Sequence, residues 1–145
     1  MNPLESLKNK QISNADITDL IYKAEKLLLC FPQVMPPIKE YFSNGVYARE
    51  MTIGKGTMIT GRIYKDKNLN ILSKGKCLIV SIDGVMEVEA PFTYVASRGS
   101  KRLFYFKEDS VWTTILGTHE TDYDKIVKEF NVDNYDDMED VCQQY

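Results

Sequence analysis

Five residues near the middle of the chain have types and spacing that could bind an anion. They are, in order, Gly56, Arg62, Tyr64, Asn68 and Gly75, and the gaps between successive members are five, one, three and six residues. A metal ion needs deprotonatable nitrogen, oxygen or sulfur donors, and a guanidinium or a carboxamide is a poor substitute. A guanidinium instead makes charge-assisted hydrogen bonds to phosphate or carboxylate. The pattern therefore argues against a metal site and predicts a cationic, polar pocket if the barrel is open.

A second arginine and three aromatic residues could complete this pocket. Side chains alternate along a strand, so Arg62 and Tyr64 are expected on one face, where Arg102 from a later strand can join them. Two buried arginines need solvent, an acid or an anionic ligand between them, because burying each charge is costly. Two interpretations stay open: ion pairs with acids such as Glu87, or capture of a phosphorylated or nucleotide-like ligand that stacks on the rings. The candidate pocket consists of Arg62, Tyr64, Asn68, Arg102, Phe104, Phe106 and Trp112.

A basic turn gives a weaker indication of anion binding. Residues 97–102, Ser-Arg-Gly-Ser-Lys-Arg, combine two hydroxyls and three cations around a glycine. Backbone N–H groups in such a turn can form a concave anion site. A solvent-exposed β-turn has a similar composition, so both interpretations stay open. The candidate residues of this turn are Ser97, Arg98, Ser100 and Lys101.

The elements that must position these residues are mainly strands. Short alternating or β-branched runs, separated by turn residues, predict eight strands without intervening helices, which favours an antiparallel barrel or sandwich. Asp83-Gly84 predicts a hairpin with a type I′ turn, and Pro91 predicts a sheet edge or a change of sheet. The expected strands span residues 46–53, 57–64, 69–73, 76–82, 85–90, 92–96, 101–107 and 110–118.

Helical periodicity is expected on both sides of the strands. Residues 13–31 form the first helix, with Ser13 as the cap, and residues 32–37 form an extended proline-rich connector. Residues 122–130 form the second helix, capped by Thr121 or Asp122. The apolar stripe of the first helix should cover a sheet face. This stripe consists of Ile17, Leu20, Ile21, Ala24, Leu27 and Leu28.

Length and composition predict one globular domain of 145 residues, with 43% hydrophobic residues and a net charge of −3. Residues 1–45 are interpreted as the helix and connector that pack on the barrel, 46–118 as the barrel, and 119–145 as the second helix and an acidic tail. The tail carries five acids after residue 130 and no lysine or arginine. It is expected to be solvated or packed.

Several functional classes receive no support from the sequence. There is no long apolar run and no basic stripe, so neither a membrane nor a nucleic acid is expected as a partner. Three cysteines without short spacing do not predict a disulfide framework or a zinc site, and a single histidine gives no catalytic pair or triad. No cofactor is expected, and folding in the cytosol is the default.

The spacing of residues 56–75 and the strand order resemble the cupin superfamily, whose fold is a double-stranded β-helix or jelly roll. The resemblance implies four metal-ligand positions, and none of them keeps a usual cupin ligand. These positions are Arg62, Tyr64, Asn68 and Arg102. Runs such as NGVYAREMTIGKGTMITG and EAPFTYVASRGSKRLFYF are similar to small cupin-like proteins of tailed bacteriophages. The resemblance implies one jelly-roll barrel of about eight antiparallel strands with an N-terminal and a C-terminal helix.

The expected function is non-enzymatic, as a virion-associated or accessory structural component of a bacteriophage. The first alternative is a metal-free protein that sequesters an anionic, nucleotide-like or phosphorylated small molecule against a host defence. The second is a sugar-nucleotide epimerase or isomerase, for which the histidine base is missing. Apolar residues on both strand faces predict a homo-oligomer that pairs through a sheet face. The resemblance also implies phage structural proteins as partners, and a location in the host cytoplasm or the virion.

Overall fold

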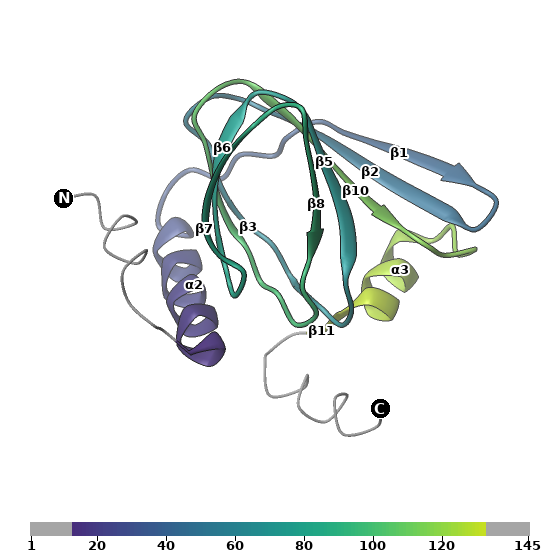
Figure 1. Ribbon diagram of the computed structural model, residues 1–145, viewed down its shortest axis with the longest axis horizontal. Coiled ribbons are helices and arrows are strands. Elements are labelled where there is room, and N and C mark those ends of the chain that lie inside the picture. The colour runs from purple at the N-terminus through teal and green to yellow at the C-terminus, as the bar shows by residue number, and fades with distance from the viewer. Residues whose placement is uncertain (1–12, 133–145) are drawn as a thin grey trace.

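Two antiparallel β-sheets packed against each other form the body of the protein (Figure 1). The computed structural model describes residues 13–132. The larger sheet has the order β1-β2-β10-β5-β8, the smaller one has the order β3-β9-β6-β7, and β4 pairs with β11. The strands are β1 Ile38–Ser43, β2 Val46–Ile53, β3 Met58–Thr60, β4 Ile63–Tyr64, β5 Asn68–Lys74, β6 Lys76–Ser81, β7 Gly84–Glu89, β8 Phe92–Ala96, β9 Leu103–Phe106, β10 Ser110–Leu116 and β11 Asn131–Val132.

The main core lies between the two large sheets. Burial alternates along β10, where every second residue from Ser110 to Leu116 is buried, as expected for a strand with one face on the core. Phe104 meets Trp112 edge to face, with ring centroids 4.9 Å apart. This architecture confirms the predicted mainly-β, antiparallel fold with flanking helices. The core consists of Ile53, Leu72, Cys77, Ile79, Val88, Phe104, Phe106 and Trp112.

Pro91 marks the crossing between the two sheets, as predicted. β7 ends at Glu89 in the four-stranded sheet, and β8 begins at Phe92 in the five-stranded sheet. Both strands are sheet edges, where the missing N–H of proline interrupts no ladder. The preceding hairpin is also confirmed, but its predicted type I′ turn is wrong. Gly84 pairs with Ser81 and has φ of +102°, whereas no non-glycine residue within 13–132 has positive φ.

Three strand predictions need correction. The expected strand 57–64 is broken, because β3 pairs with β9 while β4 pairs with β11 in another sheet. β1 was not predicted, although the Asn44-Gly45 turn is a hairpin signal; Gly45 has φ of +75°. β11 follows the second helix directly and was also missed. The break in 57–64 matters most, because it changes where Arg62 lies.

Helix α2, Asn14–Leu28, covers the outer face of the four-stranded sheet (Figure 1). Ser13 Oγ accepts a hydrogen bond from the Asp16 N–H at 3.2 Å, which confirms the predicted cap. The buried stripe is narrower than predicted, because Leu20 and Leu27 are exposed. The helix packs through Ile17, Ile21, Ala24 and Leu28 against Val80, Val85 and Leu103.

Helix α3, Tyr123–Phe130, lies at one end of the barrel beside β2 and β10 (Figure 1). Asp122 caps it by accepting a hydrogen bond from the Lys125 N–H at 3.2 Å. Ile126 is buried against Tyr47 and Leu116, so this helix closes the barrel end. Neither helix in the described part of the chain is long and apolar enough to cross a membrane. The predicted acidic tail, residues 133–145, lies outside the described residues.

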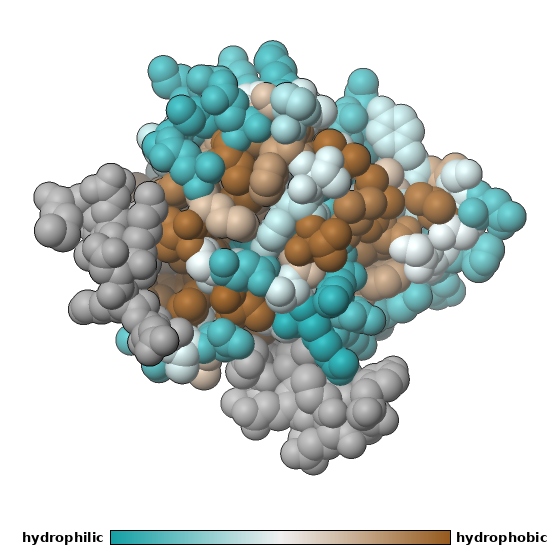
Figure 2. All heavy atoms as spheres, in the orientation of Figure 1, coloured by the Kyte–Doolittle hydropathy of each residue, from teal (hydrophilic) through white to brown (hydrophobic). Residues whose placement is uncertain are grey.

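The outer face of the five-stranded sheet carries an apolar row. Cross-strand partners lie on the same face, and the register aligns side chains from all five strands. Figure 2 shows apolar side chains exposed over the region that β2, β5 and β10 occupy in Figure 1. The row consists of Tyr41, Ala48, Ile115, Leu69 and Val95.

Candidate functional site

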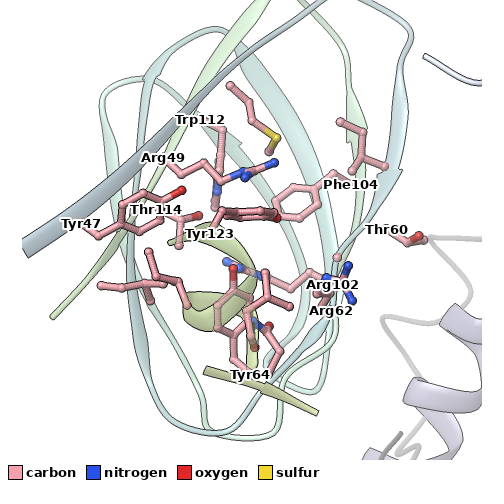
Figure 3. Close-up of a pocket in the computed structure, with 17 residues that line it drawn as sticks. Tyr47, Arg49, Thr60, Arg62, Tyr64, Arg102, Phe104, Trp112, Thr114 and Tyr123 are labelled. Carbon is pink, nitrogen blue, oxygen red and sulfur yellow. Dashed lines mark hydrogen bonds between the residues drawn. The ribbon is translucent and has the colours of Figure 1, made fainter. Parts of the chain in front are cut away.

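A cavity of about 210 Å³ opens between the sheets at the end of the barrel covered by α3 (Figure 3). Strands of both large sheets contribute to it, and α3 forms part of its wall. Polar side chains converge on it from different elements, as in ligand sites generally. Most of the wall is apolar or aromatic, and includes Met51, Ile59, Phe104, Trp112, Leu116 and Tyr123.

Arg102 reaches into this cavity from the residue before β9 (Figure 3). The residue is 3% exposed, and its Nη2 donates a hydrogen bond to Asn68 Oδ1 at 3.3 Å. Its Nη1 is buried without a hydrogen-bond partner among residues 13–132. The guanidinium carbon lies 5.4 Å from the ring centroids of Tyr64 and Phe104 and 5.8 Å from that of Trp112. The rings therefore offset part of the cost of burying the charge.

The charge of Arg102 has no ion-pair partner in the described part of the chain. Burial lowers the pKa of Arg102, and nearby Tyr64, Tyr94 and Asp83 act in the opposite direction. A guanidinium nevertheless stays protonated at neutral pH. Asp83 itself accepts hydrogen bonds from Tyr94 and Ser97. The cavity thus contains a buried positive charge that the surrounding residues compensate only in part.

Within residues 13–132 neither Arg62 nor Arg102 forms an ion pair with an acidic residue. Glu87, one of the acids considered, lies 2.7 Å from Lys107 and 3.7 Å from Lys76. Asp109 accepts a hydrogen bond from the Lys55 N–H at 2.9 Å. The anionic-ligand interpretation therefore stays open.

A chain of buried polar side chains holds Arg102 in place. Asn68 Oδ1 accepts from Asn70 Nδ2 at 2.7 Å as well as from Arg102. Asn70 Oδ1 in turn accepts from the Thr114 hydroxyl at 2.9 Å on the neighbouring strand. Asn68 was predicted from its spacing, and Asn70 was missed. The signal for Asn70 was its place two residues after Asn68 on the same strand face.

Two further unpartnered polar groups line the cavity, and sequence reasoning missed both. The Tyr47 hydroxyl and the Asn131 Oδ1 are buried and have no hydrogen-bond partner within residues 13–132. Tyr47 is 1% exposed, and burial raises its pKa. It lies across the cavity from Phe104 in Figure 3. No local pattern could have indicated Asn131, because it reaches the cavity only through the pairing of β11 with β4.

Arg49 on β2 is a second cation of the cavity wall that was not predicted. Its guanidinium carbon lies 4.3 Å from the ring centroid of Tyr123 on α3. It also lies 3.8 Å from Glu40, so its charge already has a partner. Arg49 therefore ties α3 to the sheet, and among residues 13–132 Arg102 is the cation of the cavity wall that is buried without an ion pair.

The structure brings together most, but not all, of the predicted pocket. The cavity wall includes Tyr64, Arg102, Phe104 and Trp112. Asn68 lies outside the wall and accepts a hydrogen bond from Arg102. Arg62 is exposed at the cavity edge, because it falls in the break between β3 and β4 and not within a regular strand. Arg62 and Arg102 thus line the same cavity, but only Arg102 is buried, and Arg62 reaches solvent, which is one of the options that the sequence left open. Phe106 is 1% exposed and packs in the core, stacked on Phe104 at 5.6 Å, outside the cavity wall.

The predicted anion-binding turn uses several of its donors within the fold, although the buried Ser100 Oγ has no hydrogen-bond partner among residues 13–132. The Gly99 N–H donates to Tyr64 O at 2.9 Å, and the Ser100 N–H donates to Ser97 O at 3.2 Å. Lys101 is 4% exposed, and its Nζ lies 2.8 Å from both Glu25 and the Gly61 carbonyl. Ser97 is bound to Asp83, and Arg98 is half-buried beside it in sequence. The turn anchors α2 and the β6–β7 hairpin, and we place no ligand on it.

The residues around the cavity do not fit a metal ion. The positions that the spacing assigned to metal ligands hold two guanidiniums, a phenol and a carboxamide. The buried guanidinium of Arg102 would repel a cation placed beside it. Within residues 13–132 no group of three or more histidine, cysteine, aspartate or glutamate side chains could hold a metal.

No protein-family model and no curated protein sequence matches the chain. Solved structures do match in fold. One is an uncharacterized conserved protein with a double-stranded beta-helix domain from Klebsiella pneumoniae, at 11% identity and a TM-score of 0.52, covering 63% of this chain and 85% of that one. Another is KdgF from Halomonas sp., at 12% identity and a TM-score of 0.50, covering 66% and 90%.

A third is a cupin-2 domain containing protein from Shewanella frigidimarina, at 16% identity and a TM-score of 0.46, covering 66% and 91%. At such identities the likeness to the Klebsiella and Halomonas structures concerns the fold alone, which is a double-stranded β-helix. The bacteriophage origin inferred from sequence runs stays a prediction.

Proposed function

We propose that this cupin-fold protein binds a small anion in the barrel cavity without the help of a metal ion. One observation carries the proposal: Arg102 is buried in the cavity wall, has no ion-pair partner in the described chain, and has an unpartnered Nη1. A bound anion would supply the missing charge and hydrogen bond.

The unpartnered groups around the cavity support a ligand over a purely structural role. Buried polar atoms in folded proteins are nearly always hydrogen-bonded, and leaving one unpaired costs about 1–3 kcal/mol. Tyr47, Arg102 and Asn131 each contribute such an atom to the same cavity. A virion-associated or accessory structural component gains nothing from this cost. Ligand capture therefore moves ahead of the structural role that the sequence favoured.

The size of the cavity favours a ligand smaller than a nucleotide. Its volume of about 210 Å³ lies below the range of roughly 300–1,000 Å³ that sites for drug-sized ligands occupy. Sequestration of a whole nucleotide-like molecule, one of the expectations from sequence, would require the cavity to open further. A small organic or inorganic anion needs no such change.

Thermal unfolding with a panel of anions tests the proposal. The panel contains phosphate, sulfate, short carboxylates, sugar phosphates and nucleotides. A ligand at about 100 times its Kd should add about 2.7 kcal/mol to the unfolding free energy, which raises Tm by roughly 5–10 °C for a chain of this size. Arg102→Met should remove the shift, and Lys101→Met, a matched change at the neighbouring buried cation, should keep it. An unchanged Tm across the whole panel contradicts the proposal.

A further inference from the structure

We infer that the cavity selects a monoanionic carboxylate with a small apolar body over a phosphate ester. This inference deepens the proposed function and rests on it, because it concerns the identity of the anion. Three features of the cavity carry it: the count of buried charges, the apolar wall, and the unpartnered polar groups away from Arg102.

Charge balance is the first argument. Arg102 brings one positive charge into the cavity, and the other two cations on its wall are already compensated or solvated. Arg49 pairs with Glu40 at 3.8 Å and stacks on Tyr123, and Arg62 is exposed. A carboxylate neutralises the single charge. A phosphate monoester carries about −1.5 to −2 at neutral pH, which leaves negative charge buried without a partner, at a cost of several kcal/mol.

The wall of the cavity is the second argument. Beside Arg102 the cavity is bounded by the rings of Phe104 and Trp112 and by the side chains of Met51 and Ile59. An apolar ligand body gains about 25 cal/mol for each Å² of apolar surface that it removes from water on such a wall. A polyhydroxylated sugar would lose hydrogen bonds to water there without regaining them. The cavity volume of about 210 Å³ limits that body to one ring or a short aliphatic chain.

The two remaining unpartnered groups give the third argument. Asn131 Oδ1 can only accept a hydrogen bond, whereas the Tyr47 hydroxyl can donate or accept. A ligand hydroxyl would satisfy either group, or both at once. Tyr47 lies on one side of the cavity and the stem of Arg102 enters from the other (Figure 3). A hydroxyl group distant from the carboxylate should therefore strengthen binding.

Titration calorimetry at pH 8 with matched probes tests the inference on the full chain. The probes are benzoate, cyclohexanecarboxylate and hexanoate, each with its neutral amide, together with phenyl phosphate, inorganic phosphate and 4-hydroxybenzoate. At least one carboxylate should bind, and its amide and the phosphates should bind about tenfold or more weakly, which corresponds to about 1.4 kcal/mol. Arg102→Met should abolish carboxylate binding, and Lys101→Met should preserve it. Tyr47→Phe should keep benzoate binding but reduce any preference for 4-hydroxybenzoate.

The outcomes distinguish a failure of the inference alone from a failure of the proposed function. Tighter binding of a phosphate than of every carboxylate overturns the inference and leaves anion binding intact. Equal binding of a carboxylate and its amide overturns both, because the charge is then not recognised. Failure of all anions to bind overturns the proposed function, and the inference falls with it.

Discussion

The stability of the Arg102→Met variant distinguishes a ligand-binding arginine from a structural one. A structural arginine stabilises the fold, so replacing it lowers the unfolding free energy. An arginine retained for a ligand is a cost to the unliganded protein, because its charge is buried with no ion-pair partner in the part of the chain that the structure describes. We therefore expect Arg102→Met to leave the unliganded protein at least as stable as the unmodified chain.

The magnitude follows from the contacts of Arg102. Methionine keeps most of the apolar stem and fills irregular space well. The substitution removes one hydrogen bond, 3.3 Å long, worth about 1 kcal/mol, and cation–π contacts worth about 2 kcal/mol. Asn68 Oδ1 keeps its bond from Asn70, so no new unpaired acceptor appears. Relief from burying the charge, several kcal/mol, exceeds these losses. We expect a net gain of about 1–3 kcal/mol, or roughly 2–10 °C in Tm.

Lys101→Met is the matched control, because the neighbouring cation is also buried but has partners. Lys101 Nζ lies 2.8 Å from both the Glu25 carboxylate and the Gly61 carbonyl. Removing the Lys101 ammonium should lower the unfolding free energy by about 1–3 kcal/mol. The loss is no larger than this because the half-exposed Glu25 can bind water in its place. Urea unfolding of both variants without ligand measures the two changes. A loss of stability in Arg102→Met equal to that in Lys101→Met, with anion binding retained, would show that Arg102 is structural.

Three further predictions concern the fold and its assembly. Gly75→Ala should lower the unfolding free energy, measured with urea, by at least about 2–3 kcal/mol, because the new Cβ would lie 2.0 Å from Ser110 Oγ at a φ of +94°. Gly56→Ala is the control: its φ is +85° but the space around it is open, so the loss should be about 1 kcal/mol. Equal losses in the two variants would contradict this prediction. Burial and a hydrogen bond to the Asp83 carboxylate raise the pKa of Tyr94 to about 12. The stability that Tyr94 contributes to the fold is therefore complete below pH of about 10 and is lost as the pH rises through about 12. Tyr94→Phe should flatten this alkaline loss of Tm. Val95→Lys, on the apolar row of the five-stranded sheet and 56% exposed, should dissociate the expected homo-oligomer without unfolding it; an unmodified chain that sediments as a monomer would make the oligomer prediction wrong.

The strand pattern was predictable because alternation and turn residues act locally. Pro91 indicated the change of sheet from its missing N–H alone. The break between β3 and β4 was not predictable in this way, because residues 57–64 alternate as one continuous strand would. The break depends on two distant partners: β9 pairs with β3, and β11 pairs with β4. Pairings of this kind are set by the whole fold.

The contrast between local patterns and long-range pairings also explains which residues of the candidate site could be predicted. Asn68 and Arg102 were predicted from spacing, and the structure joins them through a hydrogen bond. Arg62 was placed beside them by strand alternation, and the break in its strand leaves it exposed. Tyr47 and Asn131 reach the cavity from the second and the last strand. No spacing in the sequence relates residues so far apart to one another.

The buried guanidinium of Arg102 places a positive charge inside the barrel, and this charge comes from a side chain of the protein itself. It resembles a bound metal ion in attracting an anion to the middle of the fold, but its donors point in fixed directions and it offers no open coordination position. It also cannot lower the pKa of a bound water as a metal ion does. With a single histidine in the chain, a partner for acid–base chemistry beside Arg102 is also hard to supply. The proposed binding of an anion to Arg102 needs neither of these chemical functions.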